Sequence, residues 1–84
     1  MRLAYFSWIR ERIGTPVEDV ELPATVTNVG ELLGWLKGRG DNYAAALANE
    51  GIVRVAIDRH HVADRAAAIA GAGEIALFPP MTGG

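Results

Sequence analysis

The sequence predicts an α+β domain in which one helix lies across one face of a small mixed β-sheet. The chain has 84 residues, which is enough for one small domain and too few for two. Hydrophobic residues make up 50% of the sequence and charged residues 21%, a balance typical of chains that fold. Segments with strand and helix patterns follow in the order strand, strand, helix, strand, strand, and this order indicates the fold class.

The first third of the chain predicts two strands with a short helix between them. Residues 3–6 are β-prone and form the expected first strand. Ser7 is expected to cap a helix that continues through Ile13 and stops at Gly14. Residues 17–22 alternate imperfectly between two prolines, which confines the second strand to an edge of the sheet or to a hairpin.

The clearest helical pattern lies in the middle of the chain. Four apolar residues spaced at i, i+3, i+4 and i+7 make one stripe, namely Val29, Leu32, Leu33 and Leu36. Asn28, just before the stripe, and Glu31, three residues later, have the spacing of a capping box. We expect this main helix to end within residues 37–40, and a second short helical piece within residues 41–50.

The last third predicts the strands that complete the sheet. Residues 52–57 are β-branched and alternating, so one face of this strand should be buried. A short strand is expected near residues 61–63. Residues 74–78 form the final strand, which ends at Pro79 and Pro80 because proline donates no hydrogen bond to a sheet.

Strand alternation predicts which side chains the main helix covers. One face of the first and last strands presents Leu3, Tyr5, Ile75 and Leu77. If this face packs under the helix, Phe6 and Phe78 lie on the uncovered face. Two aromatic rings there form a small apolar patch, which is typical of a protein interface.

Composition excludes several classes of function. The net charge of −2 gives no electrostatic reason to bind a phosphate backbone, so we expect no nucleic-acid partner. The absence of cysteine rules out disulfides and Cys-type zinc sites and suits a reducing cytoplasm. The apolar residues 3–9 are too short for a membrane span and show no cleavage pattern, so we expect no anchor, membrane partner or signal peptide.

No catalytic or metal-binding constellation is predicted either. The adjacent residues His60 and His61 point to opposite faces of an extended segment, so we expect them to hold no metal ion. A domain of this size has a thin core and cannot enclose a deep substrate cavity. We therefore expect no autonomous enzyme with a large pocket.

The C-terminus carries the most informative motif. After the two prolines come two further residues and then Gly83 and Gly84. Glycines lack Cβ atoms, so such a tail can thread a narrow channel in a partner. A carboxylate presented there can attack the α-phosphate of ATP to give an acyl-adenylate, which a sulfur or amine nucleophile displaces. The alternative is a frayed end without function, and composition alone leaves both interpretations open.

Residues 73–84, with their Phe-Pro-Pro-x-x-Gly-Gly ending, closely resemble the end of the molybdopterin synthase small subunit, the MoaD family of ubiquitin-like sulfur carriers. A first strand ending in Phe6, a short helix with Arg10 and a stop at Gly14 also look like this family. The resemblance implies a β-grasp domain over residues 1–80, with four to five strands, and a flexible tail over residues 81–84.

The resemblance also implies how the chain acts. Gly84, preceded by Gly83, would be adenylated by an ATP-dependent enzyme similar to ubiquitin-activating enzymes, converted to a thiocarboxylate with a sulfur-donor enzyme, and would deliver sulfur to a cyclic pyranopterin in the large subunit of molybdopterin synthase. The expected complex is a heterotetramer in which this chain donates sulfur without itself catalysing. Residues expected to contact partners are Phe6, Arg10, His61, Phe78, Pro79, Pro80, Met81 and Thr82.

Two departures from the family pattern and three alternatives accompany this hypothesis. Gly73 replaces an acidic residue and is expected to loosen the turn before the last strand, and His61 stands where an apolar residue is common. A thiamine-type sulfur carrier would share Gly83 and Gly84 but lack the Phe-Pro-Pro ending. A ubiquitin-like protein modifier would join Gly84 to a lysine, and an interaction module would have an inert tail.

Overall fold

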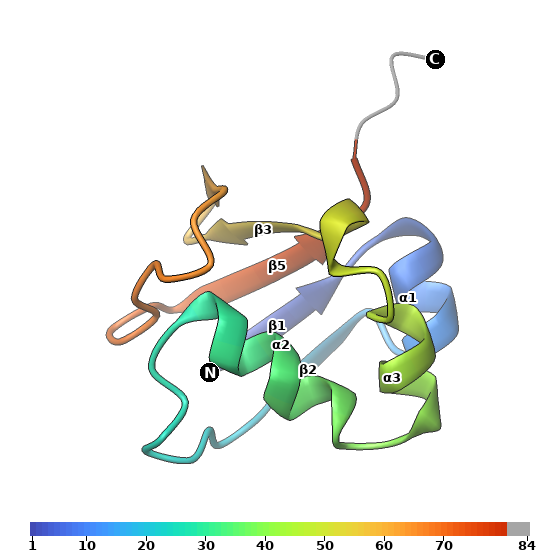
Figure 1. The fold of residues 1–84 in the computed structure, drawn as a ribbon, viewed down its shortest axis with the longest axis horizontal. Helices are drawn as coiled ribbons and strands as arrows, with labels where there is room; N and C mark the ends of the chain where they lie inside the picture. Colours follow the sequence, from blue (N-terminus) through green and yellow to red (C-terminus); the bar gives the residue numbers. More distant parts are fainter. Residues whose placement is uncertain (81–84) are drawn as a thin grey trace.

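The computed structural model describes residues 1–80, and Met81 to Gly84 lie outside the described residues. Its sheet has the order β2-β1-β5-β3-β4, with β1 and β5 parallel and the other neighbours antiparallel. The elements are β1 (Arg2–Tyr5), α1 (Ser7–Ile13), β2 (Val17–Asp19), α2 (Val29–Lys37), α3 (Asp41–Ala46), the 3₁₀ helix η1 (Glu50–Ile52), β3 (Arg54–Ile57), β4 (His60–Val62) and β5 (Glu74–Phe78). The helix α2 lies across one face of the sheet, and α1 packs against α3 (Figure 1). The predicted α+β class is confirmed.

One core joins the helix stripe to the covered face of the sheet. The stripe of α2 and the predicted inner residues of β1 and β5 are all at most 1% exposed, namely Val29, Leu32, Leu33, Leu36, Leu3, Tyr5, Ile75 and Leu77. Asn28 caps α2 through its Oδ1, which accepts from the Glu31 N–H at 2.8 Å. The Glu31 carboxylate accepts from the N–H of Thr27, one residue earlier than an ideal capping box.

The structure corrects three of the predicted boundaries. Phe6, not Ser7, occupies the N-cap position of α1, and no side chain caps this helix. Ser7 is instead the first helical residue, with a left-handed φ of 56°. β2 ends at Asp19, and the chain at Ile52 forms a 3₁₀ turn, so β3 begins only at Arg54. These differences lie at element ends, where contacts with other elements decide the conformation.

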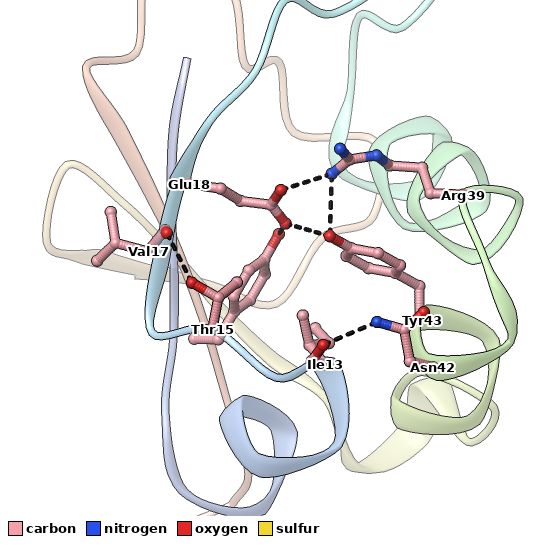
Figure 2. A network of polar contacts seen from close by, with 8 residues as sticks. Ile13, Thr15, Val17, Glu18, Arg39, Asn42 and Tyr43 are labelled. Carbon is pink, nitrogen blue, oxygen red and sulfur yellow. Dashed lines mark hydrogen bonds and ion pairs between the residues drawn. The ribbon is translucent and has the colours of Figure 1, made fainter.

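A polar network ties the edge strand β2 to the helices. The Glu18 carboxylate accepts hydrogen bonds from the Tyr5 hydroxyl at 2.7 Å, the Tyr43 hydroxyl at 2.6 Å and the Arg39 guanidinium at 3.0 Å. Figure 2 shows Glu18 reaching from β2 toward Arg39 and Tyr43. Arg39 also lies over the rings of Trp35 and Tyr43. Partial burial raises the pKa of Glu18, but the three donors outweigh burial and lower this pKa below its usual value.

We expect Glu18→Gln to reduce stability at neutral pH and to flatten its acid dependence. A group with a lowered pKa in the folded state stabilises the fold above its ordinary pKa, and this contribution is lost as the pH falls through the folded-state value. Urea unfolding at pH 7 should show a loss of about 1–2 kcal/mol, as for hydrogen bonds to a charged group. The difference between variant and wild type should shrink as the pH falls below about 4. The exposed Glu21→Gln serves as the control, and an equal effect of both variants would contradict the prediction.

Candidate functional site

The candidate site surrounds the end of β5, the strand that leads into the tail. β5 lies in the sheet between β1 and β3, and its last residue is Phe78. On one side the Phe6 N–H donates to the Leu77 carbonyl at 3.1 Å. On the other side Arg54 is the register partner of Phe78. The base of the tail is therefore held by two neighbouring strands.

The open face of the sheet, opposite α2, is lined by small side chains. A row of register partners crosses all five strands in the order Val17, Ala4, Ala76, Ala56 and His61. Three alanines occupy its central strands, and α2 covers the opposite face of the sheet (Figure 1). Ala4 and Ala56 at its centre are only 4% and 9% exposed, so larger neighbouring side chains cover the middle of this face.

Aromatic side chains lie where this face meets the tail. Phe6 is 48% exposed and is one of two exposed large hydrophobic residues in residues 1–80. Phe78 is half-buried, and its ring centroid lies 5.8 Å from that of His61 on β4. Phe6 and Phe78 thus lie outside the covered core, as alternation predicted, and the structure places His61 against Phe78.

The remaining predicted site residues are placed as follows. Pro79 and Pro80 follow β5 and are half-buried. Arg10 is an exposed residue of α1, and its backbone N–H donates to the Phe6 carbonyl at 3.3 Å. Met81, Thr82, Gly83 and Gly84 lie outside the described residues, so their predicted roles stay predictions.

Sequence reasoning missed a cavity and an exposed side chain at this end of the sheet. A cavity of about 330 Å³ is lined by Val53, Arg54, His61, Val62, Ala63 and Arg65. Ile52, in η1 just before β3, is 41% exposed. Its position two residues before Arg54 was a usable signal, since alternation in the expected strand would have put both on the uncovered face.

The turn before β5 is held by an aspartate. The Asp58 carboxylate accepts from the backbone N–H groups of Gly73 and Glu74, each at 2.9 Å. Asp58 and Arg59 form the two-residue turn between β3 and β4, with left-handed φ angles of 47° and 71°. Asp58 therefore anchors this turn, and the effect of Gly73 on it stays a prediction.

Within residues 1–80, no three His, Asp or Glu side chains gather closely enough to hold a metal ion. In the same part of the chain, no helix has the length and apolar composition needed to cross a membrane. The site can present the tail to a partner, beside the sheet face opposite α2, which carries aromatic side chains.

Comparisons with known proteins agree with the fold described above. The ThiS family profile matches residues 3–84. SAMP1 (small archaeal modifier protein 1) of Haloferax volcanii is 25% identical with a TM-score of 0.72, over 100% of this chain and 98% of that chain. The HVO 2177 protein of the same organism is 27% identical with a TM-score of 0.73, over 99% of this chain and 84% of that chain.

A third solved structure shows the fold alone. It is a Pyrococcus furiosus protein described as molybdopterin converting factor subunit 1, and it is 20% identical with a TM-score of 0.75 over 95% of both chains. None of the curated protein sequences matches the chain. The solved neighbours confirm the predicted ubiquitin-like β-grasp fold.

Proposed function

Because the chain belongs to the ThiS family of ubiquitin-like sulfur carriers, we propose that Gly84 carries sulfur as a thiocarboxylate and donates it in molybdopterin synthesis. The observation that carries the proposal is the continuous match from Leu3 to Gly84, which includes the Phe-Pro-Pro strand end and the two terminal glycines. The residues Pro79 and Pro80 after the last strand favour a molybdopterin-type sulfur carrier over a thiamine-type one.

The proposed reaction uses the chain as a reagent. A Gly84 carboxylate oxygen attacks the α-phosphate of ATP in an activating enzyme, the bond to the β-phosphate oxygen breaks, and pyrophosphate leaves. Hydrosulfide from a sulfur-donor enzyme then attacks the acyl carbon, and AMP leaves with the bonding electrons. In the synthase large subunit the thiocarboxylate sulfur attacks a carbon of the pterin precursor and displaces an oxygen substituent, which leaves with the bonding electrons. Water then attacks the acyl carbon of the resulting thioester, the acyl carbon–sulfur bond breaks, sulfur stays on the precursor as a thiolate, and the Gly84 carboxylate is restored. ATP use fits a cytoplasmic location.

The geometry of β5 supports this role. Phe78 ends a strand that is hydrogen-bonded on both sides, so the domain fixes the starting point of the tail. Six residues follow it, and an extended chain of this length reaches at most about 20 Å. A partner that docks on the open face can therefore receive Gly84 in an active site about that far from Phe78.

Intact-mass spectrometry tests the proposal. The chain is incubated with the activating enzyme, ATP and sulfide, and is expected to gain the mass of one sulfur for one oxygen, located on Gly84 by fragmentation. Omission of ATP is the control and should leave the mass unchanged. An unchanged mass in the complete mixture, with an enzyme shown to activate its own carrier, would contradict the proposal.

Gly83→Ala is expected to slow adenylation at least tenfold and to leave stability nearly unchanged. One added methyl group obstructs a tail that must enter a narrow channel, while exposed positions change stability by less than about 0.5 kcal/mol. ATP–pyrophosphate exchange measures the first effect and thermal unfolding the second. Ala70→Ser, on an exposed turn before β5, is the control. A marked fall in the melting temperature of Gly83→Ala would show that the tail belongs to the core.

A second candidate function rests on the similarity to SAMP1. A protein named a small archaeal modifier is 25% identical to this chain over its full length, which favours transfer of activated Gly84 to a lysine amine. Amide bond formation and thiocarboxylate formation share the same acyl-adenylate. An immunoblot of cells expressing an N-terminally tagged chain distinguishes them, because only the modifier gives high-mass bands that vanish when Gly84 is deleted.

A further inference from the structure

The cavity beside β3 and β4 is lined mainly by basic and apolar side chains. Arg54 and His61 reach it from the two strands, and Arg65 reaches it from the segment after β4. Val53, Val62 and Ala63 complete its lining, and no acidic residue takes part. A basic cavity on a chain with a net charge of −2 is a local concentration of positive charge.

Both arginines are held in place without a charged partner. Arg65 donates to the Glu50 and Val53 carbonyls at 2.6 and 3.0 Å, and Arg54 donates to the Gly51 carbonyl at 3.1 Å. Within residues 1–80 neither forms a salt bridge, whereas Arg2 and Arg39 each pair with a glutamate. A guanidinium has five N–H donors in a rigid plane, so these few bonds orient each group and leave donors for an anion.

The cavity is continuous with the surface on which a partner would dock. His61 lines the cavity and packs on Phe78, and Arg54 is the register partner of Phe78. Oriented arginines beside an aromatic patch are typical of residues that anchor protein interfaces. The anion that a protein surface offers to such a site is a carboxylate, which arginine binds through two parallel hydrogen bonds.

We propose that this cavity, which we call the Arg54–Arg65 cavity, receives an Asp or Glu side chain of the protein that activates the tail. The inference rests on the proposed function for the identity of the partner, and on the cavity itself for the chemistry of the ligand. The apolar patch of Phe6 and Phe78 then supplies contact area, while the ion pair fixes the orientation of the docked partner.

A titration with acetate tests the cavity without any partner. In ¹⁵N-labelled protein at constant ionic strength, acetate is expected to shift the side-chain N–H signals of Arg54 and Arg65 together with the amide of Val62. Arg54→Gln should remove the shifts at Val62. Equal shifts of all arginine signals, or unchanged Val62 shifts in the variant, would overturn the proposal. Shifts with inorganic phosphate but none with acetate would also overturn it, in favour of a phosphate-bearing ligand.

Activation kinetics test the partner. Arg54→Glu is expected to raise the KM for the chain in ATP–pyrophosphate exchange at least tenfold with little change in kcat, because docking and not chemistry is impaired. Arg59→Glu makes the same charge change at the opposite end of the β3–β4 hairpin and should change KM less than twofold. Equal effects of the two variants would overturn the proposal. If no exchange occurs even with wild type, the proposed function fails, while the acetate titration still decides whether the cavity binds carboxylates.

Discussion

Adding one serine after Gly84 is expected to abolish thiocarboxylate formation. The extension converts the Gly84 carboxylate into an amide, whose oxygen carries no full negative charge and cannot attack ATP. The new carboxylate lies about 3.5 Å further along the chain and bears a side chain. Because a misplacement of about 1 Å can cost a factor of 100 in rate, activation should fall at least that far.

Intact mass after incubation with the activating enzyme, ATP and sulfide measures this effect. Circular dichroism and thermal unfolding should match wild type, because β5 ends at Phe78, well before the added residue. Carboxypeptidase removal of the serine should restore the reaction, which provides an internal control. Thiocarboxylate on the extended chain would show that sulfur is not carried by a terminal glycine.

The parts of the fold that sequence predicted are those fixed by local pattern. The α2 stripe was correct because a 3.6-residue period over nine residues has one structural solution, a helix with Leu32 and Leu33 inward. β5 was correct at both ends, since Pro79 excludes a further ladder bond. The uncovered positions of Phe6 and Phe78 followed from the two-residue period of strands.

The features that sequence did not predict depend on contacts between distant segments. Glu18 meets Tyr5 and Tyr43, which lie 13 and 25 residues away in sequence, and no local pattern encodes that meeting. Ser7 has its left-handed φ between the Phe6 N–H bond to the Leu77 carbonyl and the start of α1, and the Leu77 partner lies 71 residues away from Phe6 in sequence. The Arg54–Arg65 cavity forms only because β4 returns the chain beside β3.

Phe78→Asp is expected to weaken binding to the proposed partner, the synthase large subunit, by about 2 kcal/mol or more, as for loss of an aromatic anchor at the centre of an interface. The half-buried ring of Phe78 contacts His61 on the open face beside the base of the tail. A carboxylate there removes apolar contact area and places an ion where a docked partner excludes water. Phe6→Asp, at a position that is 48% exposed, should act in the same direction.

Both variants should fold, because the covered face of the sheet holds the core and neither ring belongs to it. Isothermal titration calorimetry measures the affinity, and urea unfolding checks that the domain is intact. Ala70→Asp adds the same charge on an exposed turn before β5, at the end of the strand away from the tail, and should leave binding unchanged. Wild-type affinity in both phenylalanine variants would place the partner elsewhere.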